Sequence, residues 1–207
     1  LALRQIGLTQ LDAKLGYFAG LKSLEMLDLN SNKISELSAT AFEPDLSGLI
    51  YLYLDDNQIG QVAASAFAPL TSLNLLGLSE NRLNKLTSTM FVGLETSLNN
   101  LRLDRNRLST LSAGPSSANA LIKLVKINWL SLAGNQLTTL PANFFVDLPD
   151  LSTVILDDNR LSNLTLKMFK GLGQSVNLLI LNLSRNKIKQ LPAGLVKYLS
   201  GVVSDFR

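Results

Sequence analysis

Side chains that commonly carry out chemistry are scarce in this chain. It contains no cysteine and no histidine among its 207 residues. Their absence excludes Cys–His nucleophile pairs, Ser-His-Asp triads and ordinary zinc or copper sites. The candidates that remain are carboxylates, which include two adjacent pairs, Asp55-Asp56 and Asp157-Asp158.

Each acidic pair precedes an asparagine, Asn57 or Asn159. Carboxylate and amide oxygens are ligands that calcium accepts, so a calcium site is one interpretation. The pairs lie four repeats apart in the pattern described below, and no cleft for paired-carboxylate hydrolysis accompanies them. We therefore interpret them as polar turns, and we predict no enzyme activity, no metal and no cofactor.

Asparagine recurs at a nearly constant interval, with successive spacings of 25, 24, 25, 29, 24 and 27 residues. Around the copies the chain reads L-x-L-x-x-N-x-L, as in Leu130–Leu137, with Ile or Val in place of one leucine in some of them. Such a fixed-period phrase predicts a solenoid. The seven positions are Asn32, Asn57, Asn81, Asn106, Asn135, Asn159 and Asn186.

Each position of the phrase has a physical reason. The L-x-L pair alternates as a strand with one buried face must, and the next repeat supplies a parallel neighbour. The asparagine lies in the turn after the strand, where its amide can bond backbone groups that lack partners, so we expect a stacked asparagine ladder. The predicted fold is an α/β solenoid with one curved parallel sheet on its concave face. Strands are expected around Leu27–Leu29, Leu52–Leu54, Leu76–Leu78, Leu101–Leu103, Leu130–Leu132, Val154–Leu156 and Leu181–Leu183.

The return segments should form the convex side as irregular turns or short helices. A phenylalanine recurs in them, as in Phe67 and Phe145, and we interpret this column as structural. The segment 112–126 lacks this residue and is longer than its neighbours. Its Gly114-Pro115 break predicts a short amphipathic helix over 118–126.

We expect residues 1–207 to form a single array of one truncated and seven recognisable repeats. The truncated copy is Leu1–Leu8, with Ile6 in place of the asparagine. After Leu191, the residues Val196, Leu199, Val202 and Val203 predict an apolar helical face. Neither end carries a polar cap, so we expect a fragment of a longer array.

The form L-x-x-L-x-L-x-x-N-x-L-x-x-L-(P)-x-x-x-F-x-x-L, as in Leu130 through Leu148, resembles the typical leucine-rich repeat of extracellular animal proteins. The variable repeat lengths are similar to those of chaoptin-type adhesion proteins and Toll-family ectodomains. The resemblance implies a horseshoe that binds a partner, carries N-linked glycans and is secreted or displayed at the cell surface. The chain departs from the class in lacking cysteine-rich flanks.

Partner contacts are expected from strand positions that face the concave side. Exposed aromatic residues and methionine are enriched at interfaces, and strands also favour such residues for packing reasons. The candidates are Met26, Tyr51, Tyr53, Leu75, Arg102, Trp129 and Ile155. Two sequons, Asn163-Leu164-Thr165 and Asn182-Leu183-Ser184, predict N-glycosylation at Asn163 and Asn182.

These observations favour a non-enzymatic protein-recognition module of a secreted or cell-surface protein, with an adhesion, receptor or matrix role. It would bind a protein ligand or its own copy through the concave sheet. The net charge is only +3 and the basic residues are scattered, so we expect no nucleic-acid partner, and no apolar run suggests membrane insertion. Two alternatives remain open: an intracellular, cytoplasmic scaffold or regulator, for which the absence of cysteine is natural, and a self-assembling structural sheath component.

Overall fold

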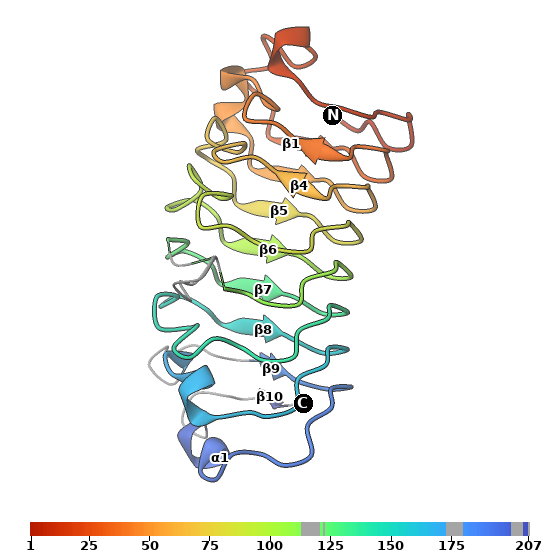
Figure 1. Ribbon diagram of the computed structural model, residues 1–207. Coiled ribbons are helices and arrows are strands. Elements are labelled where there is room, and N and C mark those ends of the chain that lie inside the picture. Colours follow the sequence, from red (N-terminus) through yellow and green to blue (C-terminus); the bar gives the residue numbers. More distant parts are fainter. Residues whose placement is uncertain (113–120, 122, 173–179, 200–204, 207) are drawn as a thin grey trace.

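The chain coils into an elongated solenoid in which successive repeats stack along one axis (Figure 1). This computed structural model describes residues 1–112, 121, 123–172, 180–199, 205 and 206. One eight-stranded parallel sheet runs the length of the molecule and carries most of its strands. The predicted solenoid with a parallel sheet on its concave face is therefore confirmed.

The main sheet has the strand order β1-β3-β5-β6-β7-β8-β9-β10, so neighbouring strands come from consecutive repeats. Leu27 pairs with Leu52, Leu52 with Leu76 and Leu76 with Leu101, so the central leucines share one register. The bounds are β1 Met26–Asp28, β3 Tyr51–Tyr53, β5 Leu75–Gly77, β6 Asn100–Arg102, β7 Trp129–Ser131, β8 Thr153–Ile155, β9 Ile180–Asn182 and β10 Asp205–Phe206. The predicted strands lie within one residue of the first seven.

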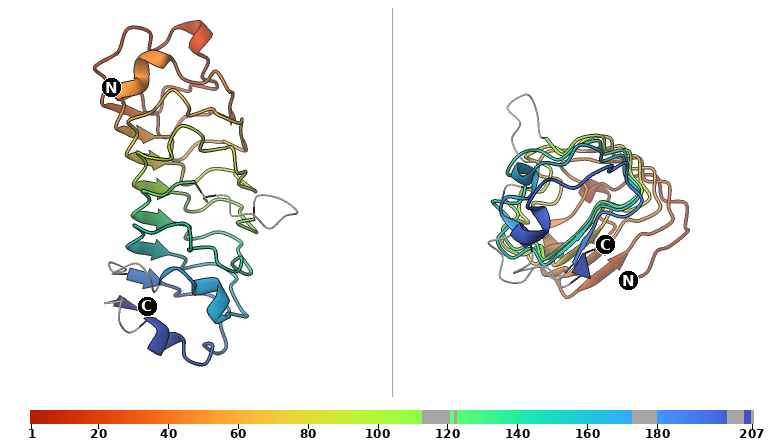
Figure 2. Two further views of the ribbon diagram at one scale, coloured as in Figure 1. Left: turned by 90° about the vertical axis from the view of Figure 1, so that its left-hand side faces the viewer. Right: turned by 90° about the horizontal axis from the view of Figure 1, so that it is seen from below.

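The convex side consists of turns and short helices, as predicted (Figure 2). A second, two-stranded sheet pairs β2 with β4 on the return path. These elements are η1 Ala13–Leu15, β2 Glu36–Leu37, η2 Pro44–Gly48, β4 Gln61–Val62, η3 Leu166–Phe169 and α1 Leu195–Leu199. The truncated first copy joins the main sheet through a parallel bridge between Ala2 and Asp28.

One continuous hydrophobic core fills the coil from Leu11 to Leu199. The phenylalanine column runs through it: the ring centroids of Phe42 and Phe67 lie 5.9 Å apart, and those of Phe67 and Phe91 lie 6.4 Å apart. Each ring is buried by the neighbouring repeats, so a single repeat cannot bury its own apolar side chains.

Two local predictions need correction. Of the predicted helix 118–126, residues 118–120 and 122 lie outside the described residues, and the remainder forms turns. There the Leu124 N–H donates to the carbonyl of Leu121, three positions earlier, at 2.9 Å. The last helix, α1, buries Leu195 and Leu199 but leaves Val196 62% exposed, because a helix of five residues has room for only one apolar edge. Val202 and Val203 are outside the described residues.

The strand β10 was not predicted. It pairs in parallel with β9, Asp205 opposite Ile180 and Phe206 opposite Leu181. The sequence there has no L-x-L phrase, so periodicity gave no signal for it.

Candidate concave recognition surface

The seven recurring asparagines form one hydrogen-bonded column just after the main sheet. The Asn106 amide nitrogen donates to the carbonyls of Leu78, at 2.8 Å, and Leu103, at 3.1 Å, and so joins two repeats. Its oxygen accepts from the Leu83 N–H at 2.9 Å. The same double pattern holds at Asn32, Asn57, Asn81, Asn135, Asn159 and Asn186.

The residue before each ladder asparagine takes a left-handed backbone conformation. The φ values are +54° at Asp56, +55° at Glu80 and +65° at Gly134. This turn directs the following asparagine inward, and only one of the seven positions is a glycine. The favourable hydrogen bonds of the asparagine therefore hold a conformation that L-residues rarely adopt. The full set is Ser31, Asp56, Glu80, Arg105, Gly134, Asp158 and Arg185.

A second side-chain column, two residues before the asparagines, was missed by the sequence analysis. The Asn30 oxygen accepts from the Asp55 N–H at 2.7 Å, and the Asp55 carboxylate accepts from the Ser79 N–H at 2.7 Å. Asp104 accepts from the Ala133 N–H at 3.0 Å and from the Ser131 hydroxyl. The signal available in the sequence was an Asn or Asp at this fixed offset.

These bonds explain the acidic pairs. Asp55 bonds to the next repeat, and Asp157 accepts from the Arg185 guanidinium at 2.7 Å. Within the described residues, no group of three or more metal-binding side chains converges. Burial raises the pKa of the Asp55 carboxyl, and the hydrogen bonds from Ser79 offset only part of that rise.

Gly77 on β5 makes room for the Asp55 carboxylate. A Cβ atom built at Gly77 would lie 2.5 Å from Asp55 Oδ2. At this point of the sheet, the half-buried carboxylate of Asp55 therefore occupies the space that a side chain at Gly77 would fill. Here the concave surface is formed by the second side-chain column, to which Asp55 belongs, as well as by the strands.

The predicted contact residues fall in two register columns of the main sheet. In the first, Met26, Tyr51 and Trp129 are exposed by 45%, 36% and 40%. Leu75 lies in this column between Tyr51 and Asn100, but it is only 9% exposed. Its prediction as an exposed contact is wrong, because the side chain is almost fully buried between its register neighbours.

In the second column, Arg102 is exposed, whereas Tyr53 and Ile155 are half-buried. Register places Arg102 between Gly77 and Ser131, both of which are buried. The Arg102 guanidinium therefore projects from a part of the sheet where the neighbouring side chains are small. It separates the aromatic residues of β3 from Trp129 on β7. We call Met26, Tyr51, Tyr53, Arg102, Trp129 and Ile155 the concave patch.

The two sequons occupy different settings. Asn163 is exposed on the irregular segment that precedes η3. Asn182 is half-buried on β9, between β8 and β10, and its side-chain oxygen accepts from the Ser184 N–H at 3.0 Å. An N-linked glycan at Asn163 would project away from the sheet, and one at Asn182 would cover the last part of it.

Comparison with known proteins identifies the family to which this architecture belongs. The family model described as leucine rich repeat matches residues 3–59 and 47–108, which together make up half of the chain. The chain therefore belongs to the leucine-rich repeat family, and its repeats are of the extracellular type. In the described part of the chain, no helix is long and apolar enough to cross a membrane.

Among curated proteins, the chain is similar to prolargin of Rattus norvegicus, with 39% identity over 67 residues. That match covers 32% of this chain and 17% of prolargin. The mouse protein, from Mus musculus, matches over the same length with the same identity. The relatives are therefore much longer than the stretch that this chain shares with them.

Solved structures extend the likeness over nearly the whole chain. The TLR13-ssRNA13 complex superposes with a TM-score of 0.81 and 28% identity, covering 94% of this chain and 26% of that one. The Drosophila Toll–Spatzle complex gives 0.75 and 27%, covering 91% and 25%. Internalin C2 of Listeria monocytogenes, at 24% identity and a TM-score of 0.71, covers 100% of this chain and 79% of its own, and shows the fold alone.

Proposed function

We propose that this chain is a protein-recognition module whose concave patch binds a protein ligand or a second copy of the chain. The observation that carries the proposal is the exposure of Met26, Tyr51 and Trp129 in one register column of the main sheet. Aromatic side chains bury large areas at low entropic cost when a partner covers them. The Toll–Spatzle complex supports a protein ligand for this type of array.

The spacing of the patch suits a partner that spans several repeats. Tyr51 and Trp129 lie three strands apart, which corresponds to about 14 Å across the sheet. Arg102 lies between them and offers a guanidinium that can pair with a carboxylate. The expected partner surface therefore has an acidic group flanked by two apolar ones. A standard interface of this kind buries about 1,600 Å² in total.

The compartment and the biological role form the finer part of the proposal. The extracellular type of the repeats supports secretion or surface display, with an adhesion, receptor or matrix role. Exposed Asn163 supports passage through the secretory route. Intact mass and peptide mapping of the chain from its native source test this point. Glycan on Asn163 supports the proposal, and bare asparagine at both sequons favours the cytoplasmic scaffold.

A photo-crosslinking amino acid at Tyr51 or Trp129 tests the binding surface. The matched control carries the same amino acid at Tyr198, an exposed aromatic residue on α1. We expect a protein adduct from the two sheet positions and none from the control. Adducts from Tyr198 alone would place the interface on the convex side. An RNA adduct from the sheet would replace the protein ligand, since the TLR13 structure is a complex with ssRNA. The comparisons thus do not support the predicted exclusion of nucleic acid.

A further inference from the structure

Five of the seven repeats carry a basic residue immediately after the ladder asparagine. We call Lys33, Arg82, Arg107, Arg160 and Lys187 the cationic ridge. The two remaining positions are Gln58 and Gln136, so no repeat has a carboxylate there. The ridge therefore concentrates positive charge in a chain whose net charge is only +3.

Backbone hydrogen bonds hold these positions in one line. The Arg82 N–H donates to the Ile59 carbonyl at 2.9 Å, and the Arg107 N–H donates to the Leu83 carbonyl at 2.8 Å. The same bond forms at all seven repeats, from Lys33 to Lys187. Stacked, hydrogen-bonded segments are about 5 Å apart, so the ridge presents a row of charges parallel to the solenoid axis.

The ridge side chains have no ion-pair partner among the residues that the structure describes. All five are exposed, and none forms an ion pair with another described residue. Other arginines behave differently: Arg105 pairs with Glu80 at 2.9 Å and Arg185 pairs with Asp157 at 2.7 Å. Those paired residues belong to the turn before the asparagine and line a separate groove of about 290 Å³ along the sheet's rim.

Neighbouring ridge charges repel one another. Arg82 and Arg107 occupy adjacent repeats, as do Arg160 and Lys187. Like charges in adjacent positions reduce stability, and the neutral Gln58 and Gln136 show that this site does not need a cation for packing. A bound polyanion would relieve the repulsion.

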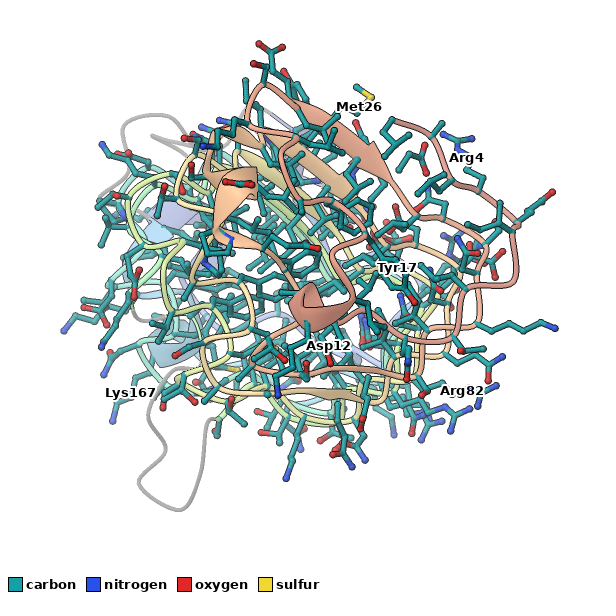
Figure 3. All side chains as sticks on the ribbon, turned by 90° about the horizontal axis from the view of Figure 1, so that it is seen from above. Arg4, Asp12, Tyr17, Met26, Arg82 and Lys167 are labelled. Carbon is teal, nitrogen blue, oxygen red and sulfur yellow. The ribbon has the colours of Figure 1, made fainter. Side chains whose placement is uncertain are left out.

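The ridge is separate from the concave patch. Viewed along the axis, Arg82 projects outward at one lateral edge, while Met26 rises from the sheet face and Lys167 lies at the opposite edge (Figure 3). A ligand on the ridge would therefore leave the sheet free. This surface goes beyond the proposed recognition of a protein.

We propose that the cationic ridge binds a linear sulfated polysaccharide. Such a chain repeats its anionic groups along its length, as the ridge repeats its cations, and basic rows attract polyanions over distances set by ionic screening. RNA is the competing polyanion. Proteins that bind single strands interleave aromatic residues with basic ones so that bases can stack. No ridge position is aromatic, so the ridge favours a polymer without bases.

The test uses a size-defined, fluorescently labelled heparin oligosaccharide and single-stranded RNA of similar charge. The ridge variant is Arg82→Gln, Arg107→Gln, Arg160→Gln and Lys187→Gln, because glutamine already occupies this position in two repeats. The control variant is Lys14→Gln, Lys123→Gln, Lys167→Gln and Lys170→Gln, four exposed residues outside the ridge. Each variant changes the formal charge from +3 to −1, since four positive charges are removed.

We expect the ridge variant to lose at least about tenfold in heparin affinity, with a shallower salt dependence, and the control to lose much less. Equal losses in both variants would reduce the effect to net charge and overturn the proposal. Tighter binding of RNA than heparin, lost in the ridge variant, would overturn the choice of polysaccharide. Circular dichroism checks folding, and the double variant Arg82→Gln/Arg107→Gln replaces the fourfold one if that unfolds.

Discussion

At the scale of single residues, the ladder asparagines contribute more to the stability of the fold than is usual for polar side chains. Each is buried, or half-buried at Asn186, and each joins two repeats through backbone groups that the turn leaves without partners. Removing such a side chain leaves both a buried donor and a buried acceptor unsatisfied. The recurrence of asparagine in the repeat therefore reflects the need to satisfy backbone hydrogen-bonding groups in the turn. The recurrence of leucine reflects the burial of the core.

We predict that Asn106→Ala lowers the free energy of unfolding by about 2 kcal/mol or more. The change removes bonds to Leu78 O, Leu103 O and Leu83 N. Urea unfolding measures the effect. Asn84→Ala is the matched control, because the Asn84 side chain is exposed. Equal midpoints for the two variants would show that the ladder adds nothing to stability.

Asp55 makes the stability of the fold depend on pH. Its folded pKa is raised, chiefly by burial, so the folded state binds a proton more readily than the unfolded chain does. This contribution to stability is therefore present at low pH and is lost as the pH rises through the folded pKa. In Asp55→Asn, the amide oxygen can still accept from the Ser79 N–H, as Asn30 does from Asp55.

We accordingly expect Asp55→Asn to be as stable as the parent or more so at neutral pH. Its advantage should shrink as the pH falls through the raised folded pKa of Asp55, because the parent carboxyl then becomes protonated. Thermal unfolding across this pH range measures the difference. A variant that is less stable at neutral pH and matches the parent in acid would mean that the folded pKa is lowered instead.

At the scale of elements, the sheet was predictable and the segments that close each coil were less so. The L-x-L phrases located seven strands because a buried strand face must alternate. Periodicity did not reveal β10, the turns of 121 and 123–126, or the orientation of α1, because these depend on contacts between distant residues. The burial of Leu75 likewise depends on its neighbours in the sheet, which no single repeat encodes.

Gly93 shows how tightly adjacent coils approach on the convex side. Its φ is +98°, and a Cβ atom there would lie 2.6 Å from Ala68 Cα, in the backbone of the preceding repeat. Gly93→Ala should therefore destabilise the fold by at least about 2 kcal/mol, through backbone strain and overlap. Gly60→Ala serves as the control, because its nearest atom is 3.9 Å away. Thermal melts compare the two, and a Gly93 variant that melts with the control would contradict this packing.

At the scale of the whole molecule, hydrogen-bonded columns that cross repeat boundaries join the repeats into one array. This array carries two separate surfaces, the concave patch and the cationic ridge. The asparagine column, the main sheet and the shared core all cross repeat boundaries, so the array is the cooperative unit. The residues of the concave patch were predictable because strand alternation decides which side chains face outward. The positions of the cationic ridge recur in the sequence, but the lack of ion pairs among the described residues is visible only in the structure. The hydrogen bonds of the second side-chain column likewise needed the structure.

The concave patch is the central functional claim, and its most direct test is an affinity measurement with the crosslinked partner. Tyr53→Ala and Trp129→Ala should each weaken binding by about 2 kcal/mol, or roughly thirtyfold in Kd, because each removes a large aromatic contact. Tyr198→Ala should leave the affinity nearly unchanged. Unchanged affinity in both sheet variants, with full folding by circular dichroism, would contradict binding through the concave sheet.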